Sequence, residues 1–243
     1  MRQNHDLTSC DEDAALRRSS ARPSAQPIKS LTNQNQSVTP VLDDVAWPVR
    51  TKRLVLRPAT LDDVEATWQI RRLESVNRWL TRAPRALDVY RADFADPASL
   101  EKSLVIELDA QVIGDLMVAV GDAWGQAEVA DKAKSVQADL GWVIHPDFGG
   151  RGLATEAVQE VLRICFEQLR LRRVTAECFT ANEPSWRLME RLGMRRETHT
   201  VNESLHRSGT WLDGFGYALL AEEWREQEPV RRLTVPMGTC DRP

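Results

Sequence analysis

The stretch that decides the fold is Phe148-Gly149-Gly150-Arg151-Gly152-Leu153-Ala154-Thr155, which joins a β-like run at 138–144 to a helix-like run at 152–169. The first N–H groups of a helix have no partner inside the helix, and the positive end of the helix dipole lies behind them. The glycines before this helix let the main chain adopt unusual dihedral angles and let a ligand approach without a Cβ in the way. The stretch therefore predicts a site for an anion such as a phosphate.

Two known phosphate-binding loops fit this stretch poorly. The nucleoside-triphosphate loop G-x-x-x-x-G-K-[ST] requires a lysine, and the chain has no lysine after Lys134. The dinucleotide fingerprint G-x-G-x-x-G is met at Gly150 and Gly152, but Thr155 stands at the third glycine position. Glu177 is a poor match for the acidic residue expected about 20 residues further on. A dinucleotide-binding domain is therefore a weak alternative.

A different family matches the stretch better. Residues 149–154 resemble the pyrophosphate loop [QR]-x-x-G-x-[GA] of the GNAT superfamily of N-acetyltransferases, except that Gly149 replaces the usual first residue. The resemblance extends over residues 50–224 and is to the ribosomal-protein alanine N-acetyltransferase branch of that superfamily. Three further segments carry it, namely 51–58, 182–194 and 211–224.

The resemblance implies an α/β (α+β) fold of the GNAT type. Its mixed central sheet has about seven strands, which splay apart at the acyl-CoA site, and helices flank the sheet. Hydrophobic periodicity supports this expectation, because alternating and helical patterns follow one another along the chain. The patterns predict strands at 53–57, 103–108, 112–120, 138–144, 174–179, 194–201 and 215–221, and helices at 60–72, 75–80, after Pro84, at 152–169 and at 184–192.

Composition suggests one domain with two tails. Residues 1–46 are rich in Asn, Gln, Ser, Thr and Pro without a sustained period, which predicts a disordered N-terminal tail. We expect the GNAT domain at 47–226 and a flexible C-terminal tail at 227–243. The Gly121–Val136 segment is too polar for a core strand, so it is either an exposed excursion or a lid over the acceptor site with Trp124 as its apolar contact.

Charge and cysteine usage narrow the class of partner. The formal net charge of −4 argues against a nucleic-acid-binding surface, which would be strongly basic. The tail composition shows no apolar stretch typical of a signal peptide or a membrane span, so we expect no membrane partner. The four cysteines have no metal-like spacing and fit a reduced cytoplasm, so we expect a cytoplasmic protein without a metal. We also expect a monomer or homodimer.

The resemblance also implies which residues bind the cosubstrate, acetyl-CoA. The strand before the loop would offer backbone groups to the pantetheine arm near Gly141, because a glycine inside a strand marks a bulge or a close approach. Asn182 could bind the coenzyme and also cap the helix that follows it. The predicted cofactor-binding residues are Val143, Ile144, Gly149, Gly150, Arg151, Gly152, Leu153, Ala154, Thr155 and Asn182.

Transfer of an acetyl group from a thioester to an amine requires a base for the amine and a proton for the departing thiolate. The matching serine of the branch lies near the coenzyme sulfur, so Ser185 is the predicted proton donor. Its alternative role is to satisfy backbone groups in the first turn of its helix. Asp139 is the predicted base, and the other candidates are Asp213, Glu203, His206 and water.

Two alternatives to this mechanism stay open. Cys178 could take the acyl group first, although it has no evident histidine partner and free cysteines are usually buried apolar residues. The chain could also be a non-catalytic acyl-CoA sensor or interaction module, for which the departure at Gly149 is the support. The leading hypothesis is an N-acetyltransferase whose acceptor is a protein N-terminal amine or a small-molecule amine.

Overall fold

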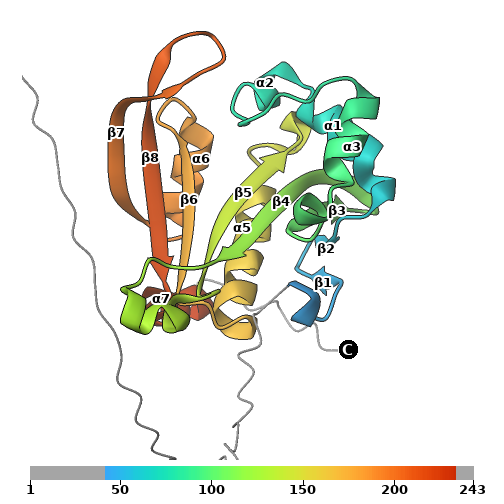
Figure 1. Cartoon of the computed structure of the whole chain (residues 1–243). Coiled ribbons are helices and arrows are strands. Elements are labelled where there is room, and N and C mark those ends of the chain that lie inside the picture. The colour runs from blue at the N-terminus through green and yellow to red at the C-terminus, as the bar shows by residue number, and fades with distance from the viewer. Residues whose placement is uncertain (1–41, 234–243) are drawn as a thin grey trace, which may run out of the picture. The chain divides into compact units, whose positions relative to one another are not determined.

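The computed structural model describes residues 42–233 of the chain, and side-chain environments from Leu42 to Gln227. These residues form an eight-stranded mixed sheet with the order β1-β2-β3-β4-β5-β6-β8-β7 and with flanking helices (Figure 1). The predicted fold class is therefore confirmed, with one short strand more than expected. The strands are β1 Val49–Arg50, β2 Val55–Pro58, β3 Ser103–Leu108, β4 Gln111–Gly121, β5 Gln137–Ile144, β6 Arg173–Phe179, β7 Arg195–Leu205 and β8 Trp211–Leu220.

The feature that organises the fold is the parting of β5 and β6. These two strands are the parallel pair of the sheet, and they pair only from Gln137 to Asp139 against Arg173 to Thr175. Beyond Asp139 each strand continues without the other as a partner. Figure 1 shows them diverging toward the end of the sheet that carries α2 and the β7–β8 hairpin. The splay leaves a gap edged by the backbones of β5 and β6 on its two sides.

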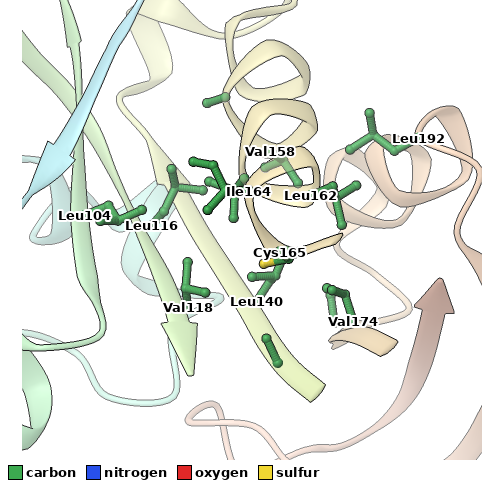
Figure 2. Packing of buried hydrophobic residues seen from close by; sticks show 14 of the residues in the cluster. Leu104, Leu116, Val118, Leu140, Val158, Leu162, Ile164, Cys165, Val174 and Leu192 are labelled. Atoms are coloured by element: carbon green, nitrogen blue, oxygen red, sulfur yellow. The ribbon is translucent and has the colours of Figure 1, made fainter. Parts of the chain in front are cut away.

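Helices cover both faces of this sheet. Asp115 of β4 contacts Arg71 of α1, whereas the next residue, Leu116, packs beside α5, so the two helices lie on opposite faces (Figure 2). Thr60 and Asp63 form a capping box before α1, as the sequence predicts. The helices are α1 Val64–Arg71, α2 Glu74–Asn77, α3 Leu87–Phe94, α4 Pro97–Leu100, α5 Leu153–Arg163, α6 Glu183–Arg191 and α7 Ala221–Leu233.

The core forms where α5 packs on the centre of the sheet. Val158, Leu162 and Cys165 lie on the predicted apolar stripe and are fully buried. Figure 2 shows them facing Leu140 of β5 and Val174 of β6. Each buried aliphatic side chain of this kind contributes about 1.5–3 kcal/mol relative to an exposed one. The core therefore holds the N-terminus of α5 in a fixed place beside the splayed strands.

Shorter elements complete the described chain. The helical pattern after α5 continues as a π-helical turn, η5, so the predicted helix extends from 153 to 168 in two parts. The remaining short helices are η1 Leu42–Asp44, η2 Leu61–Asp63, η3 Ala127–Ala133 and η4 Pro146–Phe148. At the C-terminus α7 continues to Leu233, seven residues beyond the domain end expected at 226. Of the tails predicted at 1–46 and 227–243, residues 1–41 and 234–243 lie outside the described residues, whereas Leu42 and Val45 are described and buried.

The 121–136 segment is an exposed excursion at the end of the sheet where β5 and β6 are still paired. It is closed by hydrogen bonds from Ala123 N–H to Ala133 O (2.7 Å) and from Ser135 N–H to Asp122 Oδ1 (2.8 Å). The Trp124 side chain is 88% exposed. The Trp124 side chain does not line the cavity over β6, β7 and β8, whereas a lid over an acceptor site there would have to contact it.

Candidate active site

The glycine-rich loop presents a row of N–H groups at the start of α5. Gly150 and Gly152 have positive φ angles of 70° and 75°, a conformation that favours glycine. The N–H group of Gly149 donates to Pro146 O (2.9 Å). From Gly150 to Thr155 the N–H groups have no hydrogen-bond partner within residues 42–233. Free N–H groups at the positive end of a helix dipole are suited to an anion, and anion binding at this loop stays a prediction.

Arg53 and Glu156 hold this loop in place. Arg53 donates through Nη1 to the carbonyl of Arg151 (2.9 Å) and pairs through Nε with Glu156 (2.7 Å). Glu156 also accepts from Thr51 Oγ1 (2.6 Å). Burial would raise the pKa of Glu156, but the hydrogen bonds from Thr51 and Arg53 outweigh it and lower that pKa. Sequence reasoning did not identify this brace, because its members lie about 100 residues apart.

The edge of β5 supplies backbone groups to the gap. His145 N–H donates to Ile113 O of β4 (2.8 Å). Backbone groups of successive residues in a strand point to opposite neighbours, so those of Ile144 and Trp142 face the gap. Val143 instead pairs with Asp115 on β4, and its carbonyl lies within 2.2 Å of the place where a Cβ on Gly114 would sit. Trp142, which sequence reasoning missed, is thus better directed than Val143.

Ser185 and Cys178 meet beside the other edge of the gap. The Ser185 hydroxyl lies close enough to the Cys178 thiol to act on its pKa. Burial raises the pKa of Cys178 to about 11, although the Ser185 hydroxyl and Arg196 act in the opposite direction. A thiol with this pKa is almost entirely protonated at neutral pH, which argues against the acetyl-cysteine alternative.

Asn182 precedes α6 and occupies the N-cap position. Its side chain makes no capping hydrogen bond to the helix. Of the two roles open to Asn182, capping is therefore not fulfilled by its side chain, and the amide is available to a ligand.

Asp139 lies at the last paired position of β5, at the apex of the splay. Desolvation by neighbouring atoms raises the pKa of its carboxyl although the residue is exposed, while a hydrogen bond from Thr175 Oγ1 (3.2 Å) acts in the opposite direction. A raised pKa brings a carboxylate closer to the range useful for general base catalysis. The geometry is thus compatible with the predicted role of Asp139.

Glu177 is a second acidic side chain on the face of the sheet that carries Asp139, and it lies two residues beyond Thr175 on β6. Thr175 is the last residue of β6 that pairs with β5, so Glu177 is the first same-face residue beside the gap. Continuing the register would put Gly141 opposite Glu177 on β5, and Gly216 is its partner on β8. Neither glycine has a side chain to cover the Glu177 carboxylate, which lies exposed. The glycine on each neighbouring strand was the sequence signal for this position.

A cavity of about 800 Å³ lies over this face of β6, β8 and β7. Gly214 and Gly216 alternate along β8 and leave room for the Thr200 and Thr198 side chains of β7, whose hydroxyls lie within 3 Å of where a Cβ would sit. Glu177 and Phe179 line the cavity from β6. This volume is in the range of ligand-binding pockets.

Two segments distant in sequence meet over the cavity and are named here the roof: residues 78–85, and the β7–β8 hairpin tip at 205–210. His206 Nε2 hydrogen-bonds to Arg78 O (2.8 Å), and Arg207 donates to Leu80 O. The Trp79 ring meets the rings of Phe179 and His206, with centroids 6.3 and 6.4 Å away. The roof therefore rests on Phe179, near the open end of the splay.

The other predicted bases fall into two groups. Glu203 and His206 line the cavity, whereas Asp213 does not. Asp213 accepts from Asn202 N–H (2.9 Å) and contacts His199 Nε2 (3.1 Å), and these contacts lower its pKa. A carboxylate with a lowered pKa is a weaker base, so Asp213 is the least suitable of the three.

Among residues 42–233, no group of three or more His, Cys, Asp and Glu side chains is placed to hold a metal ion. None of the helices in that range is long and apolar enough to cross a membrane.

Comparisons with known proteins agree with this geometry. The chain is 38% identical over 86 residues, 35% of its length, to the uncharacterized N-acetyltransferase YnaD of Bacillus subtilis. It is 32% identical over 92 residues, 38% of its length, to YdaF of the same organism, a putative ribosomal N-acetyltransferase. Each match spans half of the relative's own length. The YdaF match supports the branch that the sequence resembles.

A solved structure shares the fold. Mycobacterium smegmatis RimJ in complex with CoA-disulfide superimposes with a TM-score of 0.58 at 22% identity, covering 74% of this chain and 90% of that one. The family model for the acetyltransferase (GNAT) domain matches residues 53–195, which include the loop, the splayed strands and Glu177. The chain therefore belongs to the GNAT family of acetyltransferases.

Proposed function

We propose that this protein transfers an acetyl group from acetyl-CoA to a primary amine by direct attack while both substrates are bound. The observation that carries the proposal is the gap between β5 and β6. The N–H groups of 150–155 stand at one end of it, and the cavity with Glu177 lies over the neighbouring strands. A phosphate-binding loop and an amine pocket on one splayed sheet suit a reaction between a long coenzyme and a separate acceptor.

The residues around the gap fit coenzyme A. The N–H groups from Gly150 to Thr155 would hold the pyrophosphate, with Arg151 adding positive charge. The backbone groups of Trp142 and Ile144 would hydrogen-bond the pantetheine arm. The Asn182 side-chain amide makes no capping hydrogen bond and would also contact the coenzyme. Structural likeness to RimJ, which was solved with CoA-disulfide, supports this assignment. The backbone of Val143 pairs with β4 and does not face the gap, and the Val143 side chain is buried.

The proposed reaction forms a bond from nitrogen to carbon and breaks the bond from carbon to sulfur. The amine must first lose a proton, because an alkyl amine with a pKa of roughly 10.4 is protonated at neutral pH. Glu177 or Asp139 accepts this proton, directly or through water. The leaving thiolate takes a proton from the Ser185 hydroxyl, and Ser185 regains one, directly or through water, from the nitrogen as the amide forms. A backbone N–H group at the β5 edge stabilises the charge that develops on the carbonyl oxygen.

A thiol-release assay with acetyl-CoA tests this function. The acceptors would be N-terminal peptides, polyamines, aminoglycosides and free amino acids. We expect thiol release that depends on the acceptor, and a mass increase of one acetyl group on the amine. Tight coenzyme binding without thiol release over the whole panel would instead support the non-catalytic sensor. A cytoplasmic location and a monomeric or homodimeric state stay predictions from the sequence.

Two matched variants identify the base. We expect Glu177→Gln to lower kcat by about 10²-fold, the usual range for loss of a general base, and to flatten the rise of rate with pH. Asp139→Asn would have the smaller effect if Asp139 acts only by tuning its surroundings. Asp213→Asn is the control, because Asp213 does not line the cavity and its lowered pKa makes it a weak base. Full activity of Glu177→Gln together with loss in Asp139→Asn would assign the base to Asp139.

A further inference from the structure

A second cavity, named here the inner cavity, lies between the helices α1 and α3 and the strands β3 and β4. Its volume is about 240 Å³. Its larger apolar surfaces come from Tyr90 and Phe94 of α3, Val105 of β3 and Met117 of β4. None of the residues proposed above to bind coenzyme A or to transfer protons lines it. The inner cavity therefore has no role in the function proposed so far.

Five charged side chains line the inner cavity, and four of them form pairs. The five are Arg71, Arg82, Asp93, Lys102 and Asp115. Arg71 Nε donates to Asp115 (3.0 Å), and Arg82 pairs with Asp93 at 3.3 Å. The Lys102 ammonium has no hydrogen-bond or ion-pair partner within residues 42–227. The lining therefore carries one positive charge that no carboxylate compensates.

The polar groups at the floor of the inner cavity leave a further donor unused. Asp115 is only 5% exposed, and it occupies the Nε and Nη2 atoms of Arg71. Arg71 Nη1 has no partner among the described side chains. Desolvation raises the pKa of Tyr90, so its hydroxyl keeps its proton, which it donates to Thr67 Oγ1 (3.1 Å). A ligand that completes the hydrogen bonding of Arg71 must therefore supply an acceptor.

The charge and the size of the inner cavity limit the ligand. The Asp93 side chain is 47% exposed, so water can solvate its second oxygen, and the groups left for a ligand are the donors of Lys102 and Arg71. One carboxylate matches one uncompensated ammonium, whereas a phosphate or a dicarboxylate would bring charge that loses its water without a partner. A cavity of about 150 Å³ holds one benzene ring, so 240 Å³ has room for such a ring with a short side chain.

We propose that the inner cavity binds a small monocarboxylic acid whose apolar body is about as large as one phenyl ring. The carboxylate contacts Lys102 and Arg71, and the apolar body lies beside Met117. Such a site binds its ligand whether or not the protein transfers acetyl groups. Arg82 and Ala83 line both the inner cavity and the larger cavity of about 800 Å³, so the ligand would adjoin the roof.

Calorimetric titration of the full chain with three probes tests the site. The probes are phenylacetate, phenylacetamide, which has nearly the same shape without the charge, and acetate, which lacks the apolar body. We expect phenylacetate to bind about tenfold more tightly than phenylacetamide, because hydrogen bonds to a charged acceptor are the stronger ones. Acetate should bind more weakly than both. Saturating coenzyme A should leave the phenylacetate affinity unchanged, since it would occupy the loop before α5 and not the inner cavity.

Variants of single basic residues locate the carboxylate. Lys102→Gln should reduce the preference for phenylacetate over phenylacetamide to about threefold or less, and Lys102→Arg should retain it. Lys102 has no partner to lose within residues 42–227, so we expect both variants to unfold at the same temperature as the unmodified protein. Arg85→Gln is the matched control, because Arg85 lines the larger cavity and not the inner one.

Nuclear magnetic resonance locates the apolar body without any enzymatic reaction. In protein labelled at its methionine methyl groups, the phenylacetate ring should show nuclear Overhauser contacts to the Met117 methyl group. Met117→Leu would assign that signal.

Three results would overturn the inference. The first is equal affinity for phenylacetate and phenylacetamide in the unmodified protein, and the second is the absence of both binding heat and a contact to Met117. The third is loss of binding in Arg85→Gln with no change in Lys102→Gln, which would place the acid in the larger cavity. None of these results bears on thiol release, which tests the proposed function separately.

Discussion

At the scale of single residues, Ser185 has a partner that the sequence did not reveal. Its hydroxyl acts against the rise in the pKa of the Cys178 thiol, which burial takes to about 11. The Cys178 thiol is a poor nucleophile at neutral pH, so we retain the Ser185 hydroxyl as the proposed proton donor and no acyl-cysteine step.

We expect Ser185→Ala to lower kcat about tenfold at pH 7, the low end for loss of a proton donor, because a thiolate leaves readily. The loss should shrink above a pH of about 8.5, the usual pKa of a thiol, where the thiolate leaves without a proton. The measurement is a pH profile of thiol release. Ser204→Ala, in the cavity lining from β7, is the control. A loss that is equal at every pH would point to a structural role instead.

At the scale of elements, the proposed ligand contacts of the loop before α5 come from its backbone. Gly152 occupies the left-handed region as the N-cap of α5, and Arg53 braces the preceding carbonyl. The glycines were recognisable in the sequence because the helix pattern begins directly after them. The brace was not recognisable, because β2 and α5 come together only when the sheet forms.

We expect Gly152→Ala to weaken coenzyme A binding about tenfold. An alanine in the left-handed region costs roughly 1–2 kcal/mol, and relaxing this strain turns the N–H groups away from the ligand. Calorimetric titration with coenzyme A measures the effect. Gly209→Ala is the matched control, since Gly209 has a similar φ of 84° with open space around it and lies in the hairpin tip. Equal affinities for the two variants would contradict the role of the loop.

At the scale of the whole molecule, ion pairs join the strands on the C-terminal side of the gap to the last helix. Glu197 of β7 pairs with Arg173 of β6 and with Arg195, and Arg195 also pairs with Glu223 of α7. The hydrogen bonds from Arg173 and then Arg195 outweigh the effect of burial and lower the pKa of Glu197 to about 2. A carboxyl with a lowered folded-state pKa stabilises the fold above its ordinary pKa and loses this effect as pH falls toward 2.

We expect Glu197→Gln to lower the free energy of unfolding by about 1–2 kcal/mol at pH 7, allowing for solvent screening. The difference from the unmodified protein should decline between about pH 4.5 and pH 2, because both proteins then lack the charge. Urea unfolding at pH 7 and at pH 2.5 measures it. Glu183→Gln, which removes an exposed pair with Arg187 on α6, should change little at either pH. A deficit that is equal at both pH values would indicate lost packing instead.

The sequence by itself determined the glycine-rich turn before α5 and the α5 stripe, whereas resemblance to a family supplied the fold class. The turn and the stripe are local patterns, because helix periodicity and glycine placement are read along the chain without knowledge of distant contacts. Asp139 and Ser185 were found by resemblance to a family and not by their surroundings. Tertiary structure alone decided that Glu177 faces a cavity, that Trp142 and Ile144 direct backbone groups to the gap, and that two distant segments form the roof. The physical reason is that a strand's partners, and the place where pairing stops, depend on packing between residues far apart in the chain.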